Sequence, residues 1–209
     1  MPETKLKVTL LNHTPNPVRS VAFAARLCMF NKTIDELKEV ITDEYAQELV
    51  KKLIEMGHDS PTEHVIFTFG IEGISRACSH QLVRHRIASY SQQSQRYVNE
   101  KDFNYIVPPE IESNSDAKNI FCEHIETLNE TYKKLVELGI KKEDARFVLP
   151  NACETKIICT FNIRSLKNFF KLRLDKHAQW EIRAMANQMF DLVYELCPIF
   201  FEDIKEKYF

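Results

Sequence analysis

Glycine is scarce in this chain of 209 residues. The four glycines are Gly57, Gly70, Gly73 and Gly139, whereas average usage would give roughly fifteen. None of them combine into G-x-G-x-x-G or G-x-x-x-x-G-K-[ST], which excludes a Rossmann dinucleotide fingerprint and a P-loop. Any phosphate that this protein binds must therefore be held by side chains or by bare helix N-termini.

Long apolar runs and paired cysteine motifs are also missing. No run approaches the roughly 18 apolar residues of a membrane span, and the first residues show no apolar signal region. The cysteines have neither C-x-x-C nor zinc-ribbon spacing and lie in apolar patterns, so we expect reduced, buried thiols in a cytoplasmic protein that does not enter the membrane. They are Cys28, Cys78, Cys122, Cys153, Cys159 and Cys197.

The remaining composition is that of a globular protein, with 44% hydrophobic and 28% charged residues. At roughly 150 residues per domain, this length predicts a single domain spanning residues 1–209. The formal net charge of −2 argues against a dedicated duplex-DNA binder, because such proteins are usually basic.

Local patterning predicts a helix-rich α+β protein. Alternating polar and apolar residues predict strands at 5–11, 65–72 and 154–162. Ser60 and Pro61 predict a short helical turn, and residues 87–98 show no periodicity. Apolar residues at helical spacing, with capping residues at the ends, predict helices at 17–30, 33–57, 75–85, 116–138, 142–148, 164–174 and 179–196.

Arginine is concentrated in one segment. Arg84, Arg86 and Arg96 fall within 13 residues, and no acidic residue lies between Gln81 and Asn99. The segment is also rich in hydroxyl and amide side chains, a combination that suits phosphate and base edges and predicts a polyanion pocket. The alternative is a surface patch whose arginines pair with carboxylates elsewhere in the fold.

At this segment the sequence resembles a known family. Arg84-His85-Arg86, seven further residues and Ser94 are similar to the R-H-R-x7-S signature of the flavin-dependent thymidylate synthases. The stretch from His58 to His64 resembles the family's H-x-[ST]-P-x-E-H element. Residues 162–168 and 172–181 resemble its C-terminal active-site elements. Order and spacing agree over about residues 8–205.

The resemblance implies an enzyme that converts dUMP to dTMP by reductive methylation. The carbon donor is 5,10-methylenetetrahydrofolate, the reductant is NADPH acting through FAD, and tetrahydrofolate is released. No enzyme nucleophile is expected. The implied fold is a helix-rich α+β domain with a twisted, mainly antiparallel sheet. The implied assembly is a homotetramer with shared active sites, without nucleic acid or membrane partners.

The resemblance also implies roles for individual residues. Arg173 and His58 are the expected catalytic residues: a fixed guanidinium on the uracil can stabilise negative charge there, and the histidine lies close to flavin and folate. The expected dUMP contacts are Gln81, Arg84, Gln92, Ser94, Gln95, Arg96, Arg146 and Arg173. The expected FAD contacts are Ser60, Arg84, His85, Arg86, Gln92, Asn162, Arg164 and Asn168.

One position departs from the family pattern. Gln92 stands where many members carry glutamate, so it keeps the size and one acceptor oxygen but loses the charge. We therefore expect Gln92 to bond the nucleotide or the flavin and not to act as a general base. Ser94 has no activating base beside it and is expected to be a binding hydroxyl. Cys78 and Cys153 are expected to be buried thiols, not nucleophiles.

Two other functions start from different residues. A metal-dependent hydrolase would use the histidines between 58 and 85, although no H-x-x-x-H or H-E-x-x-H pair occurs and no metal site is expected. An RNA-binding protein would use the arginine segment together with Tyr90 and Tyr97, against which the net charge of −2 weighs. Bound flavin in the purified protein would separate both from the enzyme.

Overall fold

The computed structural model describes residues 4–209. The chain is 56% helical and has one four-stranded antiparallel sheet, which confirms the predicted α+β class. The strands are ordered β1-β2-β4-β3 across the sheet. They are β1 (Lys7–His13), β2 (Ile66–Ser75), β3 (Ala88–Gln92) and β4 (Glu154–Asn162).

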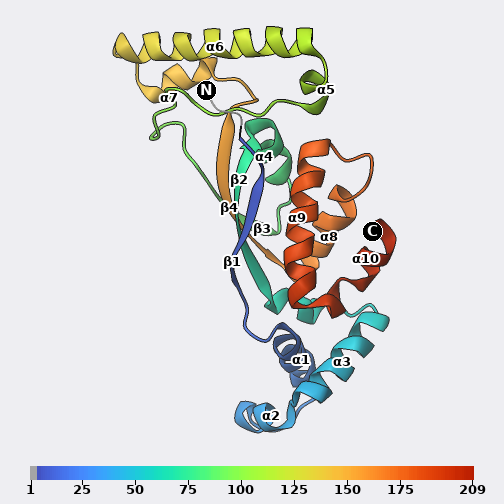
Figure 1. Ribbon diagram of the computed structural model, residues 1–209. Helices are drawn as coiled ribbons and strands as arrows, with labels where there is room; N and C mark the ends of the chain where they lie inside the picture. The colour runs from blue at the N-terminus through green and yellow to red at the C-terminus, as the bar shows by residue number, and fades with distance from the viewer. Residues whose placement is uncertain (1–3) are drawn as a thin grey trace. The chain divides into compact units, whose positions relative to one another are not determined.

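The chain forms two compact units, of which the first comprises residues 4–7, 71–84 and 91–158. Its helices are α4 (Arg76–Leu82), α5 (Pro109–Glu112), α6 (Ser115–Glu137), α7 (Lys142–Ala145) and the 3-10 turn η2 (Arg146–Val148). The long α6 runs beside α7 (Figure 1). Phe103, Ile125 and Cys153 form a buried cluster in this unit.

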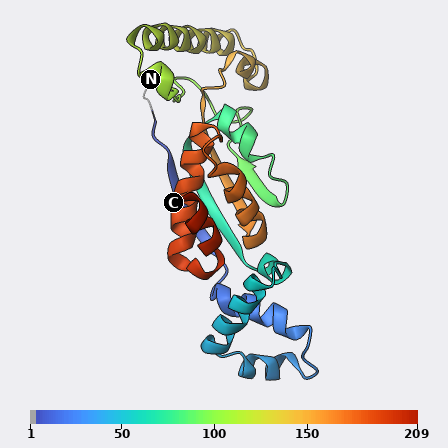
Figure 2. The same ribbon diagram turned by 90° about the vertical axis from the view of Figure 1, so that its right-hand side faces the viewer.

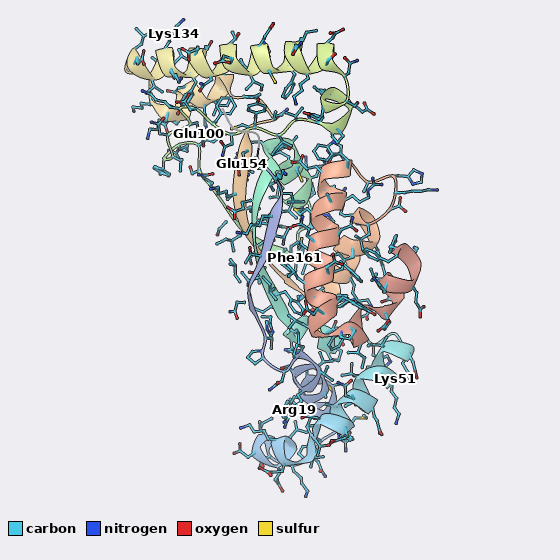
Figure 3. All side chains as sticks on the ribbon, in the orientation of Figure 1. Arg19, Lys51, Glu100, Lys134, Glu154 and Phe161 are labelled. Carbon is cyan, nitrogen blue, oxygen red and sulfur yellow. The ribbon has the colours of Figure 1, made fainter. Side chains whose placement is uncertain are left out.

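The second unit comprises residues 8–70, 85–90 and 159–209. Its helices are α1 (Pro17–Leu27), α2 (Ile34–Val40), α3 (Asp43–Glu55), η1 (Ser60–His64), α8 (Ile163–Arg173), α9 (Trp180–Leu196), η3 (Pro198–Phe200) and α10 (Glu202–Tyr208). Helices α8 and α9 lie side by side (Figures 1 and 2). Phe161 of β4 is directed toward them (Figure 3), and its ring lies 5.5 Å from that of Phe169. Phe170 of α8 lies edge-on to Phe190 of α9 with ring centroids 5.4 Å apart, and this contact helps to hold the two helices together.

The helix predicted at 33–57 is wrong as a single element, because the chain breaks into α2 and α3. Thr33 forms the expected capping box with Glu36 and starts α2. Thr42 is a second N-cap: its side chain accepts a hydrogen bond from the backbone N–H of Tyr45 at 3.2 Å, while Ile41 leaves helical geometry. A cap of this kind gives the backbone N–H groups a partner outside the helix, and α3 begins anew.

Gly57 ends α3 as predicted. Its φ of 71° is left-handed. The next N–H, of His58, donates to the carbonyl of Leu53 at 2.8 Å, and the Gly57 N–H donates to that of Ile54 at 3.0 Å. This pair of bonds is a Schellman motif, which satisfies carbonyls that the helix itself leaves open.

Strand β3 lies where the lack of hydropathy periodicity indicated no regular element. Its side chains do alternate, half-buried and then exposed. The half-buried positions are Ala88, Tyr90 and Gln92, two of which are polar, so a hydropathy pattern does not register them. The short α5 was also not predicted, while β4 has the predicted bounds.

The cysteines only partly follow the expectation of buried thiols. Cys78, Cys153, Cys159 and Cys197 are buried, but Cys28 is exposed, because it lies just after the end of α1. All six are free. Burial raises the pKa of the Cys153 thiol to about 12, so it stays protonated and unreactive at neutral pH. Within residues 4–209, no helix has both the length and the apolar character needed to cross a membrane.

Candidate functional site

The second unit contains a cavity of about 420 Å³, called here the second-unit cavity. Its walls come from η1, from the segment after α4, and from the end of β4 with the start of α8. It is lined by Glu63, His85, Arg86, Ile87, Asn162, Arg164, Ser165 and Asn168. Five of the eight residues matched to FAD contacts therefore lie on one cavity.

The first turns of α8 supply three of these side chains. Asn162 is the N-cap, and its side-chain oxygen accepts from the backbone N–H of Ser165 at 2.8 Å. Arg164 and Asn168, four residues apart, both reach the cavity, as their spacing on one helix face predicts. Capping thus directs the start of α8, and its polar side chains, toward this space.

The two arginines at the second-unit cavity differ in whether a carboxylate pairs with them. Arg164 pairs with Glu63, with an N–O distance of 2.5 Å. Within residues 4–209, Arg86 has no carboxylate partner. The cavity therefore keeps one uncompensated guanidinium, which suits an anionic group such as a phosphate. Glu63 belongs to the motif at residues 58–64 but was not among the expected contacts.

His85 is held on three sides. The Tyr90 hydroxyl donates to its backbone carbonyl at 2.8 Å, and its ring lies edge-on to Phe169 at 4.9 Å. Nε of Arg173 donates to its Nε2 at 3.0 Å. Burial, followed by the charge of Arg173, lowers the pKa of His85 from 6.5 to about 4. The imidazole is therefore neutral at pH 7, with its proton on Nδ1 because Nε2 acts as an acceptor.

The first unit has its own cavity, of about 250 Å³, called here the first-unit cavity. It is lined by Arg76, His80, Gln95, Arg146, Phe147, Leu149, Pro150 and Asn151. Gln95 and Arg146 are among the residues matched to dUMP contacts. Arg76 and His80 were not among the expected dUMP or FAD contacts, and His80 entered only the metal-hydrolase alternative, although their spacing of four on α4 predicts a shared face.

Gln92, also in the first unit, makes two side-chain hydrogen bonds. Its Nε2 donates to Ser79 Oγ at 2.8 Å and to Thr155 Oγ1 at 3.0 Å. Both hydroxyl residues are buried, with 0% and 2% of their surface exposed. The Gln92 amide is therefore held by β4 and α4.

The arginine segment divides into paired and unpaired members. Arg96 donates from Nε and Nη2 to Glu143 Oε2 at 3.1 and 2.9 Å, so this side chain fits the alternative of a patch paired with carboxylates. Arg84 is exposed, and no carboxylate of residues 4–209 pairs with it. Ser94 accepts from the Arg96 N–H at 3.2 Å in a local turn.

Other predicted residues lie outside both cavity linings: His58, Ser60, Gln81, Arg84, Gln92, Ser94, Arg96 and Arg173. His58 and Ser60 are exposed at the end of α3 and the start of η1. Over residues 4–209, no three His, Cys, Asp or Glu side chains gather as a metal ion would require.

Residues 9–199 match the profile of the family described as "Thymidylate synthase complementing protein". The chain is 50% identical to the flavin-dependent thymidylate synthase of Geobacter sulfurreducens, over 95% of this chain and 86% of that protein. It is 46% identical to the protein of that name from Clostridium tetani, over 94% and 86% of the two chains. For the Pyrococcus furiosus protein of the same name the identity is 42%, over 89% and 78%.

Proposed function

The chain belongs to the family of flavin-dependent thymidylate synthases, and on that premise we propose that it converts dUMP to dTMP. The carbon donor in this proposal is 5,10-methylenetetrahydrofolate, which leaves as tetrahydrofolate, and the reductant is NADPH acting through FAD. The observation that carries the proposal is the second-unit cavity, where five side chains matched to FAD contacts meet.

The residues around this cavity fit FAD. Arg86 offers a guanidinium without a carboxylate partner within residues 4–209, and Asn162 and Asn168 offer amides. These groups suit a pyrophosphate and the polar edges of a nucleotide, and they replace the glycine-rich cradle that this sequence lacks. Ser60, Arg84 and Gln92 complete the proposed set. When bound, the flavin supplies hydride-transfer chemistry that the side chains of this chain do not have.

The proposed nucleotide contacts divide by chemistry. Guanidinium groups neutralise the monophosphate of dUMP, and amides and hydroxyls bond its sugar and base. The guanidinium groups are those of Arg84, Arg96, Arg146 and Arg173, and the others are those of Gln81, Gln92, Ser94 and Gln95. Arg96 must exchange its pairing with Glu143 for the phosphate, whereas Arg84 is free to bind it.

Arg173 is the proposed catalytic residue on the uracil. Its Nε is tied to the neutral imidazole of His85, which fixes the plane of the guanidinium and leaves its terminal nitrogens to act as donors. Such a preset donor group stabilises negative charge as it develops on the base. His58 is the second proposed catalytic residue. Its ring is exposed, and in this proposal it orients the flavin and the folate.

Assembly and location complete the proposal. We propose a homotetramer with shared active sites, which is supported by the exposure of several matched residues, among them His58, Arg84 and Arg164. We also propose a cytoplasmic location, which the six free cysteines support.

The visible spectrum of the purified protein tests the proposal first. A flavin absorbance that bleaches with NADPH, and returns without oxygen when dUMP and 5,10-methylenetetrahydrofolate are added together, would support it. dTMP should form in step with reoxidation. A colourless protein with stoichiometric zinc, or reoxidation without dTMP, would refute it.

A further inference from the structure

Gln92 presents a defined end of its amide, and the reason lies in two buried hydroxyls. Its Nε2 donates to Ser79 Oγ at 2.8 Å and to Thr155 Oγ1 at 3.0 Å. Ser79 is fully buried on α4, and Thr155 is 2% exposed on β4. Neither of these partners can move away into solvent.

The direction of the bonds follows from the partners of the two hydroxyls. Ser79 Oγ donates its one proton to the backbone carbonyl of Arg76 at 2.9 Å, so it turns a lone pair toward Gln92. Thr155 Oγ1 also accepts from Arg76 Nη1, at 3.5 Å. The Ser79 oxygen therefore acts as an acceptor on this side, which favours the NH2 end of the amide over its carbonyl end, and Thr155 Oγ1 has a second lone pair with which it accepts from the same NH2.

The carbonyl oxygen of Gln92 is left free at the other end. No side chain within residues 4–209 donates to Oε1. This oxygen is also not buried. A buried oxygen without a partner would be an unsatisfied polar atom, and within residues 4–209 Arg26 Nε is the one side-chain nitrogen or oxygen of that kind. Gln92 thus presents only a hydrogen-bond acceptor to a ligand, whereas a glutamine without these two bonds could present either a donor or an acceptor.

We propose that Ser79 and Thr155 are positioning residues that lock the Gln92 amide so that Oε1 accepts a hydrogen bond from dUMP. The inference rests on the proposed function. A glutamate at this position would also present an acceptor oxygen to the ligand. The two hydroxyls let an uncharged amide present the same group, and they prevent the flip that would turn its NH2 outward.

The central experiment compares removal of the lock in two backgrounds, the wild-type Gln92 and the Gln92→Glu variant. Ser79→Ala combined with Thr155→Val removes both acceptors, and the dissociation constant of dUMP is measured on the flavin-loaded protein. With Gln92 present, the affinity should fall by about three- to tenfold, because the released amide samples other rotamers and the flip that turns its NH2 outward, and dUMP must order it again on binding. With Gln92→Glu, the same pair of changes should alter the affinity by less than about twofold, because either carboxylate oxygen accepts and two acceptor hydroxyls do not hold a carboxylate in place.

The control is Thr160→Val, also on β4. The Thr160 hydroxyl pairs with that of Thr68 at 2.9 Å and does not touch Gln92. This variant should leave dUMP affinity unchanged in both backgrounds. The single variants Ser79→Ala and Thr155→Val keep the comparison available if the combined variant does not fold, as judged by circular dichroism and flavin content.

Two analogues identify the donor on the nucleotide. The donors of dUMP are the imide N3–H and the 3′-hydroxyl, so N3-methyl-dUMP and 2′,3′-dideoxyuridine monophosphate each remove one of them. One analogue should bind the wild-type protein more weakly than dUMP, and that penalty should shrink when the lock is removed.

Specific results would overturn the inference. An equal loss of affinity in the wild-type and Gln92→Glu backgrounds would make the two hydroxyls purely structural. If the double variant binds flavin more weakly but, once loaded with flavin, binds dUMP as tightly as the wild type, then Oε1 contacts the cofactor and not dUMP. If the wild-type protein binds flavin and dUMP and the two backgrounds respond alike, only this inference fails. If it binds neither ligand, the proposed function fails with it.

Discussion

Nε of Arg173 donates a hydrogen bond of 3.0 Å to Nε2 of His85. The bond joins the last turn of α8 to the arginine-rich segment, and it requires a neutral imidazole. Phe169, one turn earlier on α8, packs edge-on against the same ring. An arginine proposed for the uracil and a histidine proposed for the flavin therefore depend on each other for orientation.

The folded protein should lose stability as the pH falls below about 6.5. Burial, then Arg173, lowers the pKa of His85 to about 4. Between about pH 6.5 and pH 4 the unfolded chain therefore binds a proton that the folded chain does not, and unfolding is favoured. Above about pH 6.5 this contribution is constant. Urea unfolding of the wild type and His85→Gln from about pH 7.5 to pH 4.5 should show a stability difference that changes in this window. A difference independent of pH would contradict the shift.

Arg173→Ala should abolish dTMP formation while the protein keeps its flavin. The change removes the donor group proposed to stabilise charge on the uracil, and Arg173 is outside the lining of the second-unit cavity. Single-turnover dTMP formation and the flavin spectrum measure the two effects. The pKa of His85 should also rise in part, because one of the two causes that lower it is gone. Normal turnover would remove Arg173 from the chemistry.

Arg84→Ala should weaken dUMP binding by about tenfold or more. An exposed guanidinium with no carboxylate partner among residues 4–209 is free for a phosphate, and charge-assisted bonds are the stronger ones. Equilibrium dialysis with dUMP measures the effect. Lys134→Ala is the control, because Lys134 is exposed on α6 (Figure 3) and its loss removes the same charge. If both variants lost the same dUMP affinity, Arg84 would act only through the overall charge of the protein and not through a contact with the phosphate.

Ser94→Ala should lower activity without eliminating it. The Ser94 oxygen accepts from the Arg96 N–H at 3.2 Å, and no side chain of residues 4–209 removes its proton. A binding hydroxyl contributes about one hydrogen bond, so the KM for dUMP should rise by about three- to tenfold while kcat changes little. Complete loss of turnover with intact dUMP binding would indicate a nucleophile instead.

Two glycines with the same backbone conformation should respond differently to alanine. Gly57 and Gly73 have φ of 71° and 72°. Nothing lies within 4 Å of a Cβ at Gly57, so Gly57→Ala should cost only the backbone strain of about 1 kcal/mol. At Gly73 the Cβ would lie 2.0 Å from the Lys5 carbonyl oxygen, and Gly73→Ala should cost at least about 3 kcal/mol. Denaturant unfolding measures both, and equal costs would contradict the close approach.

Secondary structure was predictable where the hydropathy pattern alone determined the element, with no competing cap or hydrogen bond. Strand β4 has the predicted bounds because buried and exposed residues alternate along it. The helix predicted at 33–57 divided because Thr42 competes as a cap within an otherwise helical pattern. Strand β3 was missed because hydrogen bonds, and not apolar side chains, place its polar residues.

Sequence spacing predicted that some residues of the second-unit cavity lie together, but it did not predict their partners. Sequence spacing put Arg164 and Asn168 on one helix face, and the structure adds Glu63, 101 residues away, as the ion-pair partner of that arginine. Likewise, the family resemblance drew attention to Gln92, but it did not predict that Ser79 and Thr155 receive its amide. Partners so distant along the chain leave no local pattern.

The sequence by itself determined the family, the α+β class, the lack of a glycine-rich phosphate cradle and the types of side chain that replace it. Those properties depend on residue identity and short spacing, which a linear chain displays. Only the tertiary structure decided which arginines are paired, which protonation state His85 adopts, and which end of Gln92 faces outward. These depend on burial and on contacts between distant segments, because desolvation and hydrogen-bond direction are set by neighbours in space.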